Sequence, residues 1–110
     1  MKLPLSCAFA ALAAVLAAPA NAGNIELGRA KAEQACASCH GKDGNTPIDP
    51  SYPKLAGQYR DFLERALLDY RSEARKNAIM VAQVKQLSRA DISNLAAYYA
   101  SLPGSMAVRR

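Results

Sequence analysis

The chain of 110 residues contains a single histidine, His40, and only three cysteines. Cys7 lies near the amino terminus, so Cys36 and Cys39 are the one pair of cysteines that lies close together in the sequence. A zinc site needs about four cysteine or histidine ligands, and this chain has too few of them. A disulfide between Cys36 and Cys39 would close so short a loop that it would stabilise the fold little. These shortages exclude a zinc site made by this chain alone and leave the cysteine pair for other chemistry.

The chain also lacks a long run of lysine or arginine, although its formal net charge is +5. The basic residues are dispersed, and no aromatic residues are interleaved with them, which speaks against nucleic-acid binding. A solvated basic surface that weakly steers charged partners is the simplest interpretation. No strand–helix–strand alternation is visible either, and such a pattern accompanies the cysteine pair of thioredoxin-like proteins.

The amino terminus has the three parts of a secretory signal peptide. Met1 and Lys2 form a short positive start, and the run from Leu5 to Ala18 is apolar and uncharged. Ala20-Asn21-Ala22 is a small-x-small cleavage site, which predicts that residues 1–22 are removed. The apolar run is too short to span a bilayer comfortably, so no stable membrane insertion is expected. We therefore expect the mature protein to be secreted to the periplasm.

Residues 23–110 are expected to form one small domain, and their patterns are helical throughout. Apolar residues recur from Tyr59 to Tyr70 at the spacing of an amphipathic helix. Asn24 is a candidate cap for a first helix, and Ser88 with Asp91 three residues later resembles a cap for the last helix. A first helix should follow Asn24 and carry apolar residues to Cys36, and a short helical piece should hold Val81, Val84 and Leu87. The last helix should open at Ser88, present Ile92, Leu95, Ala96 and Tyr99 on one face, and stop at Pro103-Gly104. Residues 41–57 are expected to form a loop.

Five consecutive residues, Cys36-Ala37-Ser38-Cys39-His40, carry the strongest chemical signal. Cys-x-x-Cys-His is the attachment motif of a covalently bound c-type haem. Two thiols three positions apart can reach the two vinyl groups of one porphyrin, and the adjacent imidazole can then bind the iron. The motif therefore predicts one haem c, held by Cys36 and Cys39, with His40 as an axial ligand. A redox-active dithiol is the alternative that the motif alone leaves open.

The chain resembles the class I c-type cytochromes, in particular the small monohaem members of the bacterial periplasm. Besides the haem motif, the resemblance depends on Gly28 eight residues before Cys36, on Tyr52-Pro53-Lys54-Leu55, and on Met80 ahead of Leu95-Ala96-Ala97-Tyr98-Tyr99. It implies an all-α fold of about four to five helices wrapped around one haem. It also implies that the first and last helices cross closely, with Gly28 beneath Leu95 and Tyr98.

The resemblance also implies further site residues. It makes Met80 the second axial ligand of the iron, and a single histidine excludes two histidine ligands from within this chain. Met106, which lies in the carboxyl-terminal tail, and an open sixth position are the alternatives. The carbonyl of Pro53 is implied as the acceptor for the second ring nitrogen of His40, and Leu55 is implied to pack against the edge of the haem.

A second group of residues is expected near the haem with less distinct roles. The candidates for propionate partners or pocket walls are Tyr52, Gln58, Tyr59, Arg60 and Tyr70. Core packing or a solvated helix face explains each of them equally well. The basic residues that flank the segments around the exposed haem edge are Lys42, Lys54, Arg75 and Lys76. They could steer an acidic partner, or they could simply keep the surface soluble.

Ligation by histidine and methionine fills both axial positions and raises the reduction potential, which suits an electron carrier rather than an enzyme. We therefore expect a monomeric periplasmic protein that exchanges single electrons with redox partner proteins. A cytochrome subunit of a periplasmic oxidoreductase is the alternative. A ligand-binding haem protein is a third possibility, which requires that Met80 does not bind the iron.

Overall fold

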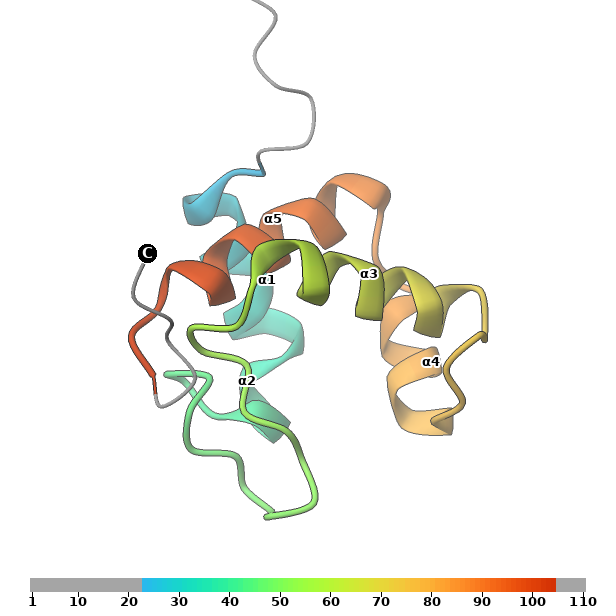
Figure 1. The fold of residues 1–110 in the computed structure, drawn as a ribbon, viewed down its shortest axis with the longest axis horizontal. Helices are drawn as coiled ribbons and strands as arrows, with labels where there is room; N and C mark the ends of the chain where they lie inside the picture. The colour runs from blue at the N-terminus through green and yellow to red at the C-terminus, as the bar shows by residue number, and fades with distance from the viewer. Residues whose placement is uncertain (1–22, 105–110) are drawn as a thin grey trace, which may run out of the picture.

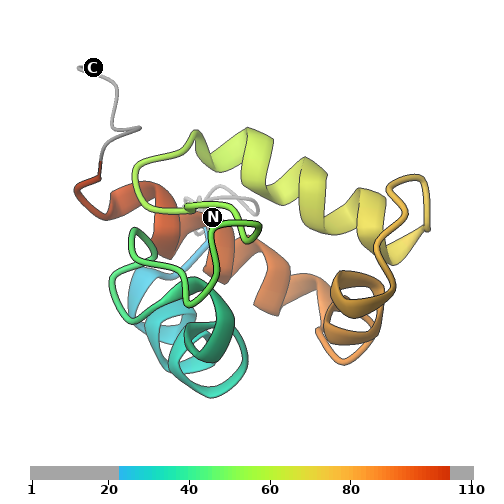
Figure 2. The same ribbon diagram turned by 90° about the horizontal axis from the view of Figure 1, so that it is seen from below.

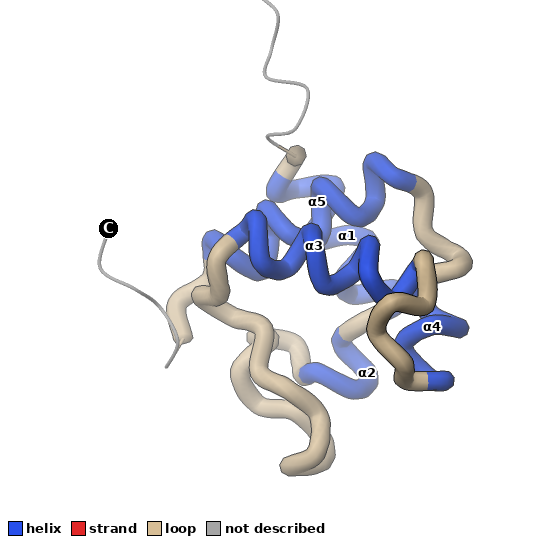
Figure 3. The backbone as a smooth tube through the Cα atoms, turned by 45° about the vertical axis from the view of Figure 1, so that its right-hand side comes forward, coloured by secondary structure: helices blue, strands red, loops and turns tan. Residues whose placement is uncertain are grey.

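The computed structural model describes residues 23–104, so the predicted signal peptide, Cys7 and Met106 lie outside the described residues. The described chain contains helices and loops and no strand (Figure 3), which confirms the all-α prediction. The helices in chain order are α1 (Ile25–Ala35), α2 (Ala37–His40), α3 (Arg60–Arg71), α4 (Ala78–Val84) and α5 (Arg89–Ser101). None of these helices is long and apolar enough to cross a membrane.

Polar side chains cap the N-termini of three of the helices. The Asn24 side chain accepts a hydrogen bond from a backbone N–H in the first turn of α1. Ser88 and Asp91 form a reciprocal capping box at the start of α5, with hydrogen bonds of 3.0 and 2.9 Å. Both predicted caps are therefore confirmed. Asn77, which no sequence pattern singles out, caps α4 by accepting a hydrogen bond of 3.1 Å from the Met80 N–H.

Helix α1 passes behind α5 in Figure 1 and packs against it at Gly28. A Cβ at residue 28 would collide with the carbonyl oxygen of Asn94 and would lie 2.7 Å from the Cβ of Tyr98. The close crossing at Gly28 is thus present, but Asn94 rather than Leu95 joins Tyr98 as the nearest neighbour. Asn94 and Tyr98 are four residues apart and form one ridge of α5, whereas Leu95 turns into the core and is 1% exposed.

The hydrophobic core lies between α5 and the helices packed against it. The largest fully buried side chains are Val84, Ile92 and Leu95. Helix α3 adds Leu63 to this core, but Phe62 beside it is 53% exposed although helical periodicity predicts it to be buried. Neighbouring side chains on a helix point about 100° apart, so Leu63 lies in the core at the edge of the cavity described below, whereas Phe62 lies on the cavity wall outside the core.

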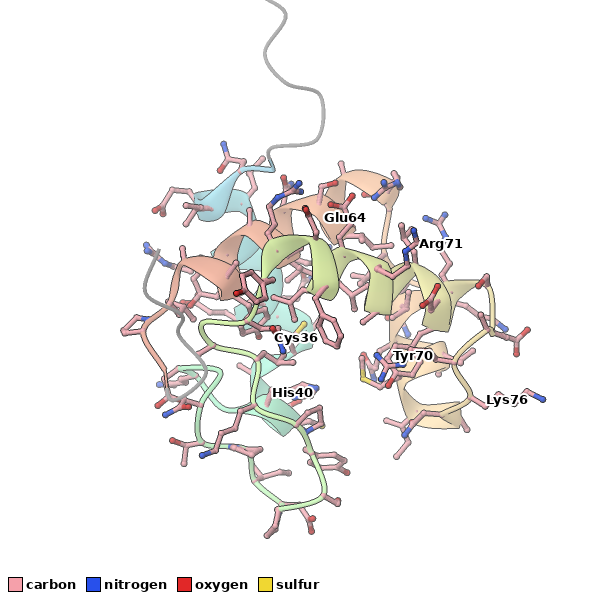
Figure 4. The ribbon with its side chains drawn as sticks, viewed as in Figure 1. Cys36, His40, Glu64, Tyr70, Arg71 and Lys76 are labelled. Carbon is pink, nitrogen blue, oxygen red and sulfur yellow. The ribbon has the colours of Figure 1, made fainter. Side chains whose placement is uncertain are left out.

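A buried carboxylate also joins α3 to α5. Glu64 is 8% exposed, and its oxygens accept hydrogen bonds from Arg60 (2.7 Å), Arg89 (2.7 Å) and Ser93 (3.2 Å). Burial raises the pKa of Glu64, but the hydrogen bonds and the two arginine charges lower it by more, so the pKa lies below its usual value. Figure 4 shows Glu64 on the upper side of α3, away from His40, so this cluster belongs to the scaffold.

The loop over residues 41–57 hangs below the helices in Figure 1 and comes to the front when the molecule is seen from below (Figure 2). Gly44 has a φ of 66°, and a Cβ there would lie 2.8 Å from the Tyr99 ring, so the position suits only glycine. The Gly44 carbonyl accepts a hydrogen bond from the Leu55 N–H at 2.7 Å, and the Gly57 N–H donates to the Tyr99 carbonyl at 3.0 Å. The first bond joins two parts of the loop, and the second ties the end of the loop to α5. A further bond of 3.1 Å, from the Ile48 N–H to the Cys39 carbonyl, holds the loop beside α2.

Candidate haem site

The cysteine pair and His40 lie together where α1 passes into α2. Cys36 ends α1 and begins α2, which carries both Cys39 and His40. The two thiols are free and half-buried, and His40 is only 5% exposed. Figure 4 shows Cys36 and His40 close together beneath α3. The five-residue motif therefore presents its three reactive side chains to the interior of the protein.

One hydrogen bond orients the His40 ring. Its Nδ1 lies 2.9 Å from the carbonyl oxygen of Pro53. A carbonyl oxygen can only accept, so the proton resides on Nδ1, and the lone pair of Nε2 remains for a metal. The Tyr52 ring stands 6.3 Å from the imidazole, measured between ring centroids, and limits it on another side. His40 thus has the tautomer and the fixed orientation that a metal ligand needs.

A cavity of about 400 Å³ opens in front of this motif, within the size range of small-molecule and cofactor sites. Side chains from all five helices and from the 41–57 loop line it, including both cysteines, His40 and the half-buried Met80 of α4. The larger apolar side chains of its wall are Leu55, Phe62, Leu63, Leu67, Ile79 and Leu95. The imidazole and the thioether therefore share one mainly apolar space, although 40 positions separate them in the sequence.

The described residues bring no negative charge to the cavity wall. Among them, Lys54 and Arg75 are its charged side chains, and neither Asp nor Glu lines it. Burial raises the pKa of the Cys36 thiol, although a hydrogen bond with the Tyr99 hydroxyl acts in the opposite direction. Burial also raises the pKa of Tyr99, as does the neighbouring Cys36. Both groups are therefore neutral at ordinary pH, and the only charges at the wall are positive.

These residues fit a haem. The two thiols can form bonds to the vinyl groups, and an imidazole nitrogen and a thioether are a familiar pair of ligands for haem iron. The apolar walls suit a large aromatic ring that must leave water. No part of this donor set depends on a residue outside the described range of 23–104.

The profile that describes cytochrome c matches residues 25–103 of the chain, a stretch that includes every residue of the cavity wall. The chain belongs to the cytochrome c family. Members of this family hold their haem covalently, so the cofactor of this cytochrome is haem c.

Several bacterial relatives resemble this cytochrome. It is 38% identical over 87 residues to cytochrome c4 from Thiocapsa roseopersicina, covering 79% of this chain and 44% of the relative. It is 39% identical over 70 residues to the thiosulfate dehydrogenase electron acceptor of Thiomonas intermedia (strain K12), covering 64% of this chain and 32% of the relative. The crystal structure of reduced recombinant cytochrome c4 from Pseudomonas stutzeri matches with a TM-score of 0.69 and 36% identity, over 76% of this chain and 48% of that one. This cytochrome therefore spans about half the length of these relatives or less.

The structure brings all six principal site residues to the cavity: Cys36, Cys39, His40, Pro53, Leu55 and Met80. Of the residues with less distinct expected roles, five line it as well: Tyr52, Lys54, Gln58, Tyr70 and Arg75. The cavity wall does not include Lys42, Tyr59, Arg60 or Lys76. Arg60 instead pairs with Asp61 and Glu64 on its own helix.

The sequence did not assign five of the large apolar wall residues to the cavity: Phe62, Leu63, Leu67, Ile79 and Leu95. Phe62 and Ile79 are more than half exposed, since they stand at the cavity outside the core. Phe62 follows the same apolar periodicity as the buried Leu63, so the pattern does not distinguish an exposed wall residue from a buried one. The position of Ile79 directly before a candidate ligand, Met80, is the one signal that could have identified it.

Proposed function

We propose that this cytochrome is a periplasmic carrier of single electrons, with residues 23–110 as its working domain. Cys36 and Cys39 bind the haem covalently, and His40 and Met80 are the axial ligands of its iron. The observation that carries this proposal is the shared cavity. The metal-binding nitrogen of His40 and the thioether of Met80 line one apolar space together with both thiols.

The surrounding residues suit a carrier better than an enzyme. When bound, the haem takes up and releases one electron at its iron. His40 and Met80 would hold the iron from both axial sides and would leave no place for oxygen or a substrate. The soft thioether of Met80 favours the ferrous state and so raises the reduction potential. The Pro53 carbonyl keeps His40 in one tautomer and orientation. Leu55 lies on the cavity wall, where it would pack against the edge of the haem ring.

The proposed location follows from the amino terminus. Residues 1–22 are a signal peptide that is cleaved after Ala22, so the protein is exported to the periplasm. The secreted protein then begins at Gly23 and carries one haem. Its mass should equal that of residues 23–110 plus one haem. A mass that retained Met1–Ala22 would contradict this part of the proposal.

The proposed assembly is a monomer that meets its donor and acceptor transiently. Weak electrostatic steering by a basic protein predicts that the rate of electron exchange falls as salt rises. The second candidate function is that of a cytochrome subunit in an oxidoreductase complex. A relative of 39% identity, named as the electron acceptor of thiosulfate dehydrogenase, favours it. Co-purification with a larger enzyme at fixed stoichiometry through high salt would decide for the subunit.

Optical spectra of the holoprotein test the ligand set. With Met80 on the iron, the ferric protein should show the weak long-wavelength sulfur-to-iron band, and the ferrous protein should resist carbon monoxide. Met80→Ala should abolish that band, lower the reduction potential and open the sixth position to added ligands, because a soft donor has been removed.

Met106→Ala is the matched control and should leave the band and the potential unchanged. If Met106→Ala abolished the band instead, Met80 would not be the ligand. A wild-type protein that binds carbon monoxide readily would favour a ligand-binding haem protein and contradict the carrier function.

A further inference from the structure

Among the described residues, Arg75 is one of two charged side chains on the cavity wall, and an aromatic ring contacts it there. Its guanidinium carbon lies 5.0 Å from the centroid of the Tyr70 ring, which is within the range of a cation–π interaction. Tyr70 is half-buried at the end of α3 and lines the same cavity. The stacked pair therefore forms part of the wall. Lys54, the other charged residue, makes no such aromatic contact among the interactions of the described chain.

The turn after α3 brings Arg75 back to that ring. Glu73 adopts a φ of 64°, in the left-handed region that residues with side chains seldom occupy. The Arg75 N–H then donates a hydrogen bond of 3.1 Å to the carbonyl of Asp69. The chain thus folds back over the last turn of α3, which places Arg75 beside Tyr70 instead of leaving it on an extended segment.

No carboxylate neutralises this guanidinium directly. None of the ion pairs among residues 23–104 includes Arg75, and the wall of the cavity contains no Asp or Glu. The positive charge of Arg75 therefore acts on whatever occupies the cavity. Because the side chain is exposed to solvent, we expect salt to screen this action in part.

We propose that Arg75, positioned by Tyr70, is a fixed positive charge that raises the reduction potential of this cytochrome. The inference rests on the proposed function, because it needs the iron between His40 and Met80. Oxidation adds one positive charge at the iron, and a nearby guanidinium repels that charge. The reduced state is therefore favoured. Arg75 would act on the iron through space and is not itself proposed as a ligand, so its role is that of a positioned charge.

The test compares holoproteins by redox titration at low and high ionic strength. Arg75→Gln should lower the midpoint potential. The equilibrium constant for reduction of the haem by a given donor should then fall roughly two- to fivefold, which is the effect expected for unit charges that interact through largely aqueous surroundings. The difference from wild type should shrink as salt rises. Arg75→Lys retains the charge and should recover part of the loss.

Arg71→Gln is the matched control, because it removes one arginine charge at the residue next to Tyr70 in the sequence. Figure 4 shows Arg71 on the opposite side of α3 from Tyr70, and Arg71 is exposed. This variant should shift the potential less than Arg75→Gln does. Tyr70→Leu releases the guanidinium, so Arg75→Gln should have a smaller effect in a Tyr70→Leu protein than in wild type.

Two results would overturn the inference. One is an equal potential for Arg75→Gln and Arg71→Gln. The other is loss of the long-wavelength sulfur-to-iron band in Arg75→Gln, because Arg75 would then support Met80 binding instead of acting as a charge. A wild-type protein that lacks the band would contradict the proposed function itself, and the inference with it.

Discussion

At the scale of single residues, Gly28 sets how closely two helices can approach. Replacement of an exposed glycine inside a helix by alanine normally stabilises a protein by about 0.5–1 kcal/mol. At Gly28 the sign reverses, because the added Cβ would meet the backbone carbonyl of Asn94. A backbone atom in a helix cannot rotate away as the end of a flexible side chain can. The crossing of α1 and α5 therefore depends on the absence of one methyl group.

We predict that Gly28→Ala destabilises the holoprotein by about 1–3 kcal/mol, the usual effect of overpacking. For a domain of this size that corresponds to a fall in Tm of several degrees or more, which thermal unfolding followed by circular dichroism would measure. Gln34→Ala, on the exposed side of the same helix, is the control and should change Tm little. An unchanged or higher Tm for Gly28→Ala would show that α1 and α5 can move apart without loss of stability.

At the scale of elements, Glu64 connects α3 to α5 through partners on both helices. Arg60 lies on its own helix, whereas Arg89 and Ser93 lie on α5, 25 and 29 residues away. The carboxylate is buried and fully hydrogen-bonded, so its ionised form is the one that the folded protein stabilises. Its pKa in the folded state is accordingly lower than in the unfolded chain. The contribution to stability is thus present above the unfolded pKa and is lost as the pH falls through the folded pKa.

We predict that Glu64→Gln destabilises the protein at neutral pH by about 1–3 kcal/mol, because hydrogen bonds to a charged group are lost. The variant should also lose less stability than wild type as the pH falls below about 4.3, the ordinary pKa of a glutamate, since it lacks a carboxylate whose pKa is lowered by folding. Denaturant unfolding of the holoproteins at several pH values measures both effects. The exposed Asp61→Asn, which removes a neighbouring charge, should alter the pH profile much less. Parallel profiles for wild type and Glu64→Gln would refute the assigned role of Glu64.

At the scale of the whole molecule, the packed protein core is small. Within residues 23–104, the largest fully buried side chains are Val84, Ile92 and Leu95, and a chain of this size supplies a marginal core on its own. The cavity lies between the helices, and apolar residues such as Phe62 and Ile79 line it. A haem in this space would cover those side chains. Cofactor attachment and folding should therefore be one event, because a group bound by the native state alone stabilises that state.

We predict that replacing Cys36 and Cys39 together by alanine abolishes covalent haem and leaves a largely unfolded or degraded chain. Haem staining after denaturing electrophoresis measures attachment, and circular dichroism measures folding. Ser38→Ala, an exposed residue between the two cysteines, should retain both haem and fold. A double variant without haem that melts cooperatively would contradict the prediction.

The sequence by itself determined the local features of this protein. The haem motif is chemically complete within five neighbouring residues, so no fold is needed to recognise it. The caps Asn24 and Ser88 were predictable for the same reason, because each cap acts on backbone groups within its own first turn. The amphipathic pattern of α3 and the glycine and proline residues around it likewise predicted the helical order of the chain.

Only the tertiary structure decided which distant groups meet. The acceptor for His40 lies 13 residues away in a loop, and the resemblance to a family, not the residues of the loop, led to Pro53. Glu64 gives no sign in the sequence of its partners on α5, and Phe62 follows the same periodicity as the buried Leu63. Such contacts depend on crossing angles between helices, as at Gly28, where Asn94 replaced the expected Leu95 as the nearest neighbour. Periodicity identifies the apolar face of a helix, but packing against the other helices decides whether each side chain meets the core, a cavity or solvent.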